Sequence, residues 1–159
     1  KPKMYTTLPK RTYISVPMML KKLGIEYMLT DDKWDTHYKI EGSPVYDCAR
    51  YFEKDMFEKS HKRVFMCLSF GHNKPLEIGH GGAILTNNKE AYKWLKRAAY
   101  DGRDLSISPW QDQKEFEVGY HYNMRPDDAV IGLNMLAAGE INKLSPHDYP
   151  DLSKVKIKE

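Results

Sequence analysis

The hydrophobic residues of the chain fall into short runs that polar segments separate. The strongest run, Arg63–Phe70, is nearly continuous and typical of a strand buried on both faces. Runs at 44–46 and 81–86 predict two more short strands. Near the N-terminus, residues 11–15 are β-prone, apolar residues at 18–23 follow helical spacing, and 25–29 predict a further strand. Residues 30–43 are polar, and we expect a loop there.

The second half of the chain predicts two helices. Asn87 has the character of an N-cap with Glu90 three residues later, so a helix should span about 88–100. A second helix should open near Pro126, with Asp127 and Asp128 in its first turn, where the helix dipole favours acids. Short buried strands between helices indicate an α/β fold, although the pattern does not give strand direction. We expect one domain over residues 1–138 and a polar tail over 139–159.

Composition narrows the possible settings of the protein. A hydrophobic fraction of 41% and a charged fraction of 30% fit a folded globular chain. No apolar run approaches the roughly 20 residues that span a bilayer, and the start lacks the apolar core of a signal peptide. The polar end at 154–159 has the character of a true terminus. We therefore expect a cytoplasmic protein without a membrane contact.

Neither the charge nor the cysteines point to nucleic acid or to a metal. The net charge of +3 is spread along the chain, whereas nucleic-acid binding usually needs a clustered basic face. Cys48 and Cys67 lack the C-x-x-C spacing of zinc sites and are expected to be buried thiols. His72 and His80 are two isolated loop histidines, a type more often solvated or packed than metal-bound, so we expect no metal site.

Three segments carry candidate chemistry. Asp47 ends an apolar strand, where ligand sites of α/β sheets lie, although an acid there can equally be a turn or cap residue. Ser69 ends the strongest strand, and Lys74 follows in a loop whose lysine could equally be solvated. The third segment, 119–127, leads into the last helix and could be an ordinary junction.

Taken together, these segments resemble the DegT/DnrJ/StrS sugar aminotransferases, which are fold-type I enzymes that use pyridoxal 5'-phosphate (PLP). Family members carry, in this order, an acid followed by x-Ala, Ser-Phe-x-x-x-Lys, Gly-Gly-Ala-x-x-Thr with apolar x, and Gly-Tyr-x-Tyr-x-Met. Here the matching segments are 47–49, 69–74, 81–86 and 119–124. The resemblance implies that the chain is part of the large PLP-binding domain of the aspartate-aminotransferase-like fold.

The resemblance also implies roles for particular residues. Lys74 would form the Schiff base with PLP and later move a proton between substrate and cofactor, for which its amine must be partly neutral. Asp47 would keep the pyridine nitrogen protonated, so that the ring accepts electrons. Ser69 would donate to the cofactor phosphate, and Ala49 completes the acid motif beside the cofactor. Arg50 stands where the family has glutamine or histidine, near the cofactor's phenolic oxygen.

The Gly-Tyr-x-Tyr segment of the family reaches across a dimer interface to the partner's cofactor phosphate. His121 or Asn123 would do so here, although the family usually has asparagine and arginine at these two positions. The resemblance therefore implies a homodimer with shared active sites.

The implied reaction transfers an amino group, with glutamate as donor, to a nucleotide-linked keto sugar for polysaccharide synthesis. Related PLP sugar dehydratases replace the lysine with histidine, and Lys74 favours transamination. Family members are longer, with a phosphate-binding loop before residue 44 and a small C-terminal domain that we do not find here. A non-catalytic or partner-dependent subunit on a truncated PLP-transferase fold is therefore the alternative.

Overall fold

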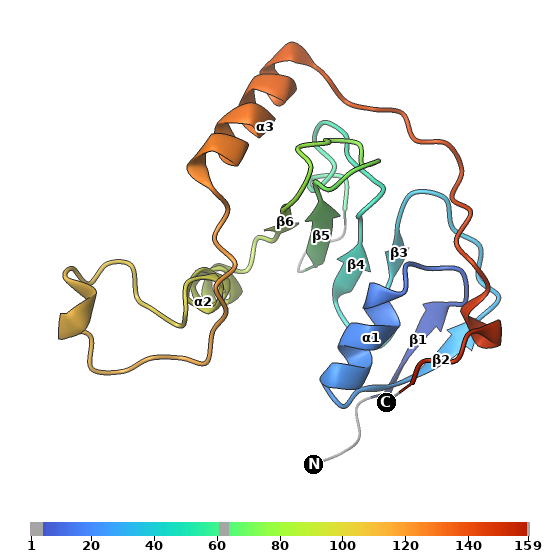
Figure 1. The fold of residues 1–159 in the computed structure, drawn as a ribbon, viewed down its shortest axis with the longest axis horizontal. Coiled ribbons are helices and arrows are strands. Elements are labelled where there is room, and N and C mark those ends of the chain that lie inside the picture. Colours follow the sequence, from blue (N-terminus) through green and yellow to red (C-terminus); the bar gives the residue numbers. More distant parts are fainter. Residues whose placement is uncertain (1–4, 61–63, 159) are drawn as a thin grey trace.

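The computed structural model describes residues 5–60 and 64–158 as an α/β arrangement of two small sheets, three α-helices and two short 3-10 helices (Figure 1). Arg63, the first residue of the strongest predicted strand, lies outside the described residues. Residues 1–4 of the predicted domain and residue 159 of the predicted tail also lie outside them. The α/β prediction is confirmed. None of the helices among the described residues is both long and apolar enough to cross a membrane.

The N-terminal sheet pairs β1 (Tyr5–Pro9) and β2 (Glu26–Thr30) in parallel, with α1 (Ser15–Lys22) as the crossover between them. Leu8, Leu20 and Tyr38 form its buried core. The helix and β2 agree with prediction. The strand predicted at 11–15 is wrong, because the helix already begins at Ser15 and the strand lies earlier, at β1.

The central sheet has the order β3 (Tyr38–Lys39), β4 (Val45–Asp47), β5 (Phe65–Ser69) and β6 (Gly82–Leu85). β4 runs parallel to β5, which places Asp47 beside Cys67, whereas β3 and β6 are antiparallel to their neighbours. The predicted strands at 44–46, 63–70 and 81–86 are confirmed in their described parts. β3 lies within the predicted loop 30–43 and is a correction to it.

The core of this sheet explains its strong sequence signal. Its buried members come from β5 and from the segments on either side of it, and they are Cys48, Met56, Val64, Met66, Leu68, Phe70 and Leu76. Gly82 lets β6 approach β5 closely, since a Cβ there would lie 2.3 Å from the Leu68 carbonyl oxygen. β5 is buried on the face of Met66 and Leu68, whereas Cys67 and Ser69 on its other face are only half-buried, so the predicted burial on both faces is wrong for the second face.

Two longer helices follow the central sheet. α2 (Lys89–Ala99) is capped by Asn88, whose side-chain oxygen accepts from the Glu90 and Ala91 amides at 3.1 and 3.0 Å. The prediction of Asn87 as N-cap is therefore wrong by one residue. α3 (Pro126–Ala138) begins with proline, has Asp127 and Asp128 in its first turn as predicted, and ends at Gly139.

Residues 101–121, which we call the arm, leave the end of α2 and return beside it (Figure 1). The arm contains the 3-10 helix η1 (Trp110–Asp112). Its base is closed by the Asp101 amide, which donates to the Tyr120 carbonyl at 3.0 Å. Gly102 and Gly119 approach each other closely there, because a Cβ on Gly119 would lie 2.2 Å from the Gly102 amide nitrogen. A Cβ on Gly102 would lie 1.7 Å from the Glu117 carbonyl oxygen.

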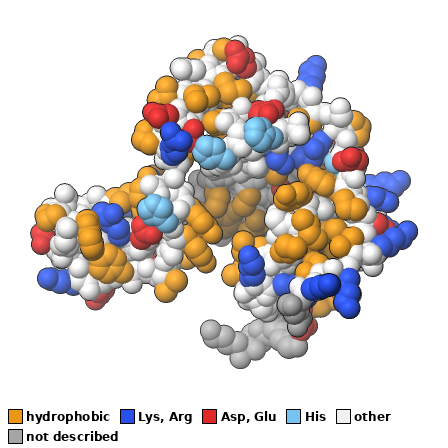
Figure 2. All heavy atoms as spheres, in the orientation of Figure 1, with side chains coloured by type: hydrophobic (Ala, Val, Ile, Leu, Met, Phe, Trp, Pro, Cys, Tyr) orange, Lys and Arg blue, Asp and Glu red, His pale blue; other side chains and the backbone are white. Residues whose placement is uncertain are grey.

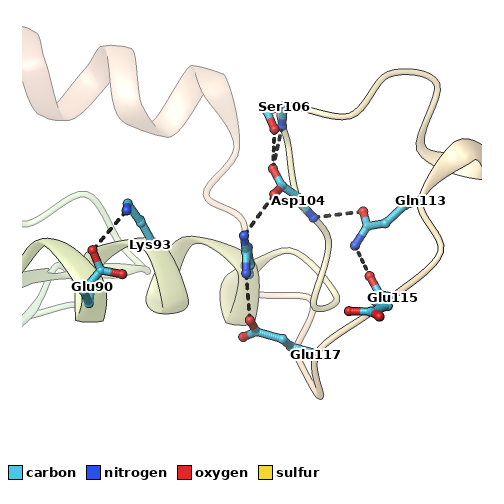
Figure 3. Close-up of polar contacts among 8 residues, drawn as sticks. Glu90, Lys93, Asp104, Ser106, Gln113, Glu115 and Glu117 are labelled. Atoms are coloured by element: carbon cyan, nitrogen blue, oxygen red, sulfur yellow. Dashed lines mark hydrogen bonds and ion pairs between the residues drawn. The ribbon is translucent and has the colours of Figure 1, made fainter.

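Polar side chains hold the arm against α2 (Figure 3). The Arg97 guanidinium pairs with Glu117 at 2.9 Å and with Asp104 at 3.0 Å. Gln113 accepts from the Asp104 amide and donates to the Glu115 carbonyl. The aromatic and aliphatic side chains of the arm are instead exposed, among them Trp110, Phe116, Val118 and Tyr120.

The segment 140–152, which we call the strap, runs from the end of α3 back to the N-terminal sheet (Figure 1). The Asn142 amide donates to the Pro75 carbonyl at 2.8 Å, and the Leu152 amide donates to the Lys10 carbonyl at 2.8 Å. Leu152, which begins the 3-10 helix η2 (Leu152–Lys154), is 6% exposed. The polar segment predicted as a tail thus lies on the folded body over much of its length.

Candidate active site

Lys74 projects from a tight loop that follows β5. The Phe70 carbonyl accepts from the amides of Ile78 and Gly79 at 3.0 and 2.9 Å, which closes the loop at its base. Asn73 has a left-handed φ of 57°, and Pro75 is buried directly after Lys74. The strap adds a contact, because the Asn142 side-chain amide donates to the Lys74 carbonyl at 3.3 Å. The backbone that carries the lysine is therefore held on both sides.

Asp47 lies at the carboxyl end of β4, the strand next to β5. Its Oδ1 accepts from the Ala49 amide at 2.9 Å, which fixes the carboxylate against the turn after the strand. Because β4 and β5 are parallel, Asp47 and Ser69 come from the same edge of the sheet. The fold thus brings together polar residues that are separated by more than twenty positions in sequence.

Five of the seven predicted site residues line one cavity of about 1110 Å³, and they are Asp47, Ala49, Arg50, Ser69 and Lys74. Its other walls come from α1, from the segment after β3 and from the strap. The space-filling view shows a hollow between the part of the molecule that holds α2 and the arm and the part that holds α1 (Figure 2). One cavity therefore holds an amine, a carboxylate, a hydroxyl and a guanidinium.

The surroundings of Lys74 favour a neutral amine more than water does. Burial lowers the pKa of Lys74, the Asp47 carboxylate opposes this, and the Arg50 guanidinium lowers it further. Since a neutral amine is the form that attacks an aldehyde, the direction of this shift suits a lysine that binds a carbonyl group.

Arg50 and Ser69 supply groups suited to anionic oxygens. The Arg50 guanidinium donates to the Ser145 carbonyl, while its Nε is buried without a hydrogen-bond partner. The Ser69 hydroxyl lies 3.5 Å from the Gly71 amide, so a hydroxyl and a backbone N–H stand together at the cavity wall. Both arrangements can serve a phosphate or a phenolate.

His121 and Asn123 are not among the described residues that line this cavity. His121 lies at the base of the arm, where its Nδ1 is 3.0 Å from Asp101, and its side chain is 78% exposed. Asn123 is exposed just before α3. Within one chain, these two predicted site residues therefore stand apart from the other five.

Two tyrosines of the cavity wall did not emerge from the sequence. Tyr13 precedes α1 and Tyr149 belongs to the strap, and their ring centroids lie 6.0 Å apart. An aromatic face beside Lys74 and Asp47 can cover a planar ring. The resemblance at 11–29 was the one signal that could have drawn attention to Tyr13, whereas nothing in sequence marks Tyr149.

The remaining titratable candidates have structural partners or are unreactive. Burial raises the pKa of the Cys48 thiol to about 12 and that of Cys67 to about 11, so neither is a nucleophile near neutral pH. His72 pairs with Glu77 at 3.3 Å and His80 with Asp128 at 2.8 Å. The described residues form no cluster of three or more groups that could hold a metal.

The donor set of the cavity fits PLP. An amine is available for the aldehyde, a carboxylate for the ring nitrogen and a hydroxyl with a backbone amide for the phosphate. The buried, unpartnered Nε of Arg50 belongs to a guanidinium that suits an anionic oxygen. The volume of the cavity leaves room for a substrate beside the cofactor.

Comparison with solved structures defines the class of the fold. A putative PLP-dependent aminotransferase from Bacillus cereus ATCC 10987 superposes with a TM-score of 0.63 at 18% sequence identity. The alignment covers 86% of this chain and 47% of that chain, so this chain spans about half the length of that structure. The likeness shows that the chain has part of the fold-type I PLP-transferase fold.

Comparison with protein families gives the particular group. The family described as the DegT/DnrJ/EryC1/StrS aminotransferase family matches residues 58–143, more than half of the chain, and the chain belongs to that family. The predicted family and its cofactor, PLP, are thereby confirmed. The matched range includes Ser69, Lys74, His121 and Asn123, whereas Asp47 precedes it. No curated protein matches the chain.

Proposed function

We propose that this chain carries the cofactor site of a PLP-dependent aminotransferase, which moves an amino group from glutamate to a nucleotide-linked keto sugar. The supporting observation is that Lys74 and Asp47, from neighbouring parallel strands and the loops after them, line one cavity. Family membership supports the class of reaction, whereas the sugar, the donor and a role in cytoplasmic polysaccharide synthesis rest on the resemblance.

The residues divide the chemistry between them. Bound PLP supplies an aldehyde and an electron-accepting ring. Lys74 would hold the cofactor through Nζ at its aldehyde carbon, with the aldehyde oxygen leaving as water, and its amine, when free, would move a proton to or from the substrate carbon. The Asp47 carboxylate holds a proton at the ring nitrogen. Ser69 Oγ and the Gly71 amide bind the phosphate, Ala49 lies beside the cofactor, and Arg50 binds an anionic oxygen.

We propose that two copies of the chain share their sites. His121 and Asn123 lie outside their own chain's cavity, next to an arm whose apolar side chains are exposed. An exposed apolar surface of this kind suits an interface between subunits, and His121 or Asn123 would then reach the partner's cofactor phosphate.

The alternative is a non-catalytic or partner-dependent subunit built on part of the same fold. Its support is that Arg50, His121 and Asn123 stand where the family usually has other residues. The two functions differ in whether this chain, without another polypeptide, binds PLP covalently at Lys74.

The decisive experiment is an absorbance titration of the purified chain with PLP, followed by borohydride reduction and peptide mapping. We expect a visible absorption band and a reduced adduct on Lys74. Lys74→Ala should lose both completely, whereas Lys54→Ala, which removes an exposed lysine, should keep both. A folded protein without the band would refute the aminotransferase proposal for the chain alone and favour the partner-dependent subunit.

The substrate is tested in a second step. Glutamate should shift the visible band as it donates its amino group, and a nucleotide-linked keto sugar should restore the original spectrum. If glutamate shifts the band but no nucleotide-linked keto sugar restores it, the proposed acceptor is wrong and the proposed cofactor chemistry stands.

A further inference from the structure

The strap takes part in the wall of the cavity, although no part of the proposed function uses it. Asp148 and Tyr149 line the same cavity as Lys74 and Asp47, about 75 to 100 positions away in sequence. Leu152 is buried at one end of the strap, and Asn142 is hydrogen-bonded to the Lys74 loop near the other end. The strap therefore spans the site between two anchored ends.

An aromatic stack fixes the middle of the strap. The His147 ring stacks on Trp34 with centroids 4.2 Å apart and on Tyr149 with centroids 5.1 Å apart. His147 Nε2 donates to the Trp34 carbonyl at 2.9 Å, and the Arg11 guanidinium donates to the Tyr149 carbonyl at 3.0 Å. These contacts leave Tyr149 little freedom in backbone or ring.

Arg50 depends on this fixed segment. Its guanidinium carbon lies over the Tyr149 ring, 6.0 Å from the centroid, and one of its amino groups donates to the Ser145 carbonyl. A cation at that distance from an aromatic face is attracted by the ring quadrupole. Because an arginine side chain is long and flexible, a site that needs its charge at one place must restrain it. The strap supplies both restraints.

We propose that Tyr149 is a positioning residue that holds the Arg50 guanidinium at the cavity wall, where Arg50 binds an anionic oxygen of the ligand. The inference rests on the proposed function for the nature of that ligand. The oxygen belongs either to the cofactor or to the carboxylate of the amino donor, and both would meet the same fixed cation.

A double-mutant cycle over Arg50→Gln and Tyr149→Ala separates positioning from general support of the fold. Arg50→Gln should weaken PLP binding by about tenfold or more. Tyr149→Ala should weaken it roughly three- to tenfold in the natural background and by less than about twofold when Arg50 is already glutamine. A purely structural role of Tyr149 would instead produce the same loss in both backgrounds, and it would overturn the proposal if maleate binding to the PLP-loaded protein, measured in the same cycle, showed no coupling either.

Conservative variants protect the cycle against a folding defect. Tyr149→Phe keeps the ring and should recover most of the loss, whereas Tyr149→Leu keeps bulk without the ring quadrupole and should behave like Tyr149→Ala. Tyr92→Ala, which removes a 57% exposed tyrosine on α2, is the matched control and should leave PLP binding unchanged. If Tyr149→Leu binds PLP as tightly as Tyr149→Phe, the interaction with Arg50 is not the reason for the effect.

A readout without the cofactor separates this inference from the proposed function. The rate at which formaldehyde and cyanoborohydride methylate Lys74, followed by mass spectrometry between pH 7 and 10, reports the pKa of Lys74 in the cofactor-free chain. The charged and titratable side chains that share its cavity are Glu41, Asp47, Arg50, His72 and Asp148. Since Arg50 lowers the pKa of Lys74, Arg50→Gln should slow methylation at neutral pH.

Tyr149→Ala should slow methylation in the same direction, by a smaller factor and only when Arg50 is present. If the natural chain fails to bind PLP while this coupling is seen, the proposed function fails and the positioning role stands. Absence of coupling between Arg50 and Tyr149 in the methylation rates would overturn the positioning role whatever the chain binds.

Two titrations of the natural chain, the two single variants and the double variant decide where the anionic oxygen comes from. The first titration uses PLP. The second adds maleate, an unreactive dicarboxylate, to the PLP-loaded protein. Coupling in the PLP titration assigns the oxygen to the cofactor, and coupling only with maleate assigns it to the substrate carboxylate. Either result supports Tyr149 as the positioning residue for Arg50, and coupling in neither titration contradicts it.

Discussion

The central sheet and the arm are stabilised by different kinds of contact. In the sheet, Met66 and Leu68 are 3% and 9% exposed and pack within one apolar cluster. In the arm, Val118 is 89% exposed, and the backbone is held by the ion pairs of Arg97 and the close approach of two glycines. The sheet therefore holds its shape through its own packing, whereas the arm keeps a defined path while its apolar side chains remain available to another surface.

This contrast separates the two groups of candidate site residues. Lys74, Asp47 and Ser69 stand on the packed sheet, so their geometry is set within one chain. His121 and Asn123 stand at the foot of the arm. Changes in the two regions should consequently act on different measurements.

The largest effect is expected from the core of the sheet. Met66→Ala should lower the free energy of unfolding by about 2–5 kcal/mol, because it removes a buried side chain and leaves a cavity. Urea denaturation followed by circular dichroism measures the change. Ile84→Ala, on the neighbouring strand but 45% exposed, is the control and should cost well under half as much. Equal losses would mean that the sheet has no well-packed interior.

Gly102→Ala should act on the arm alone. The new Cβ would lie 1.7 Å from the Glu117 carbonyl oxygen at a φ of 75°, so the base of the arm must open, at a cost of about 2 kcal/mol or more. Hydrogen exchange should accelerate within 101–121 and remain unchanged in β5. Gly24→Ala has a similar φ of 68° with no atom within 4 Å, and should show only the smaller conformational cost of about 1 kcal/mol. Protection of the arm in Gly102→Ala equal to that of the natural chain would contradict the close approach.

Arg97→Met should loosen the same segment more gently. It removes the ion pairs with Asp104 and Glu117, and because these pairs are partly exposed the expected loss is smaller than that of Gly102→Ala. Hydrogen exchange of 101–121 at low and high salt measures it. The difference between variant and natural chain should shrink in 1 M NaCl because salt screens the pairs. A difference that does not depend on salt would assign the role of Arg97 to packing.

The smallest effect concerns the attachment of the strap at low pH. Hydrogen bonds from Ser153, together with Lys10, lower the pKa of Asp151 from 3.8 to about 2. A carboxyl with a depressed pKa stabilises the fold above its unfolded value, and this contribution disappears as pH falls from about 4 to about 2. The fluorescence of Trp34, measured with the two other tryptophans, Trp94 and Trp110, replaced by phenylalanine, reports the stack with His147 and should change over this range, and Asp151→Asn should remove that component. An identical pH profile in Asp151→Asn would contradict the attachment.

The elements that sequence predicted well are those with strong local signals. β5 is a continuous apolar run, α3 opens with proline and two acids, and both appear where expected. The shift from Asn87 to Asn88 at α2 is of another kind, since two adjacent asparagines are equally good caps and only the extended backbone of Asn88 decides.

The N-terminal error has a physical cause in two prolines. Residues 11–15 are rich in β-prone side chains, but Pro17, in the first turn, favours a helix start at Ser15. β1 ends on Pro9, which lacks an amide donor, and a proline in a short run argues against a strand when only the sequence is considered. Local propensity was thus overridden by the position of residues that constrain the backbone.

The chemical groups of the site could be predicted from sequence, whereas the aromatic residues that line the cavity could not. The sequence motifs predict Asp47, Ser69 and Lys74 as residues of one site, and all three line one cavity in the structure. Tyr149 was not predictable, because the strap is joined to the body by backbone hydrogen bonds and ring stacking that have no periodic pattern in sequence.

The raised pKa values of the two thiols, of which Cys48 is buried and Cys67 half-buried, make site-specific labelling practical. With pKa values of about 12 and 11, Cys48 and Cys67 are almost entirely protonated at neutral pH and react slowly with maleimides. A cysteine introduced at an exposed position of the arm, such as Lys114, would therefore accept a dye or spin label without removal of either native cysteine. Distances between two such labels would give the spacing of arms in an assembly directly, with the natural interior of the sheet left intact.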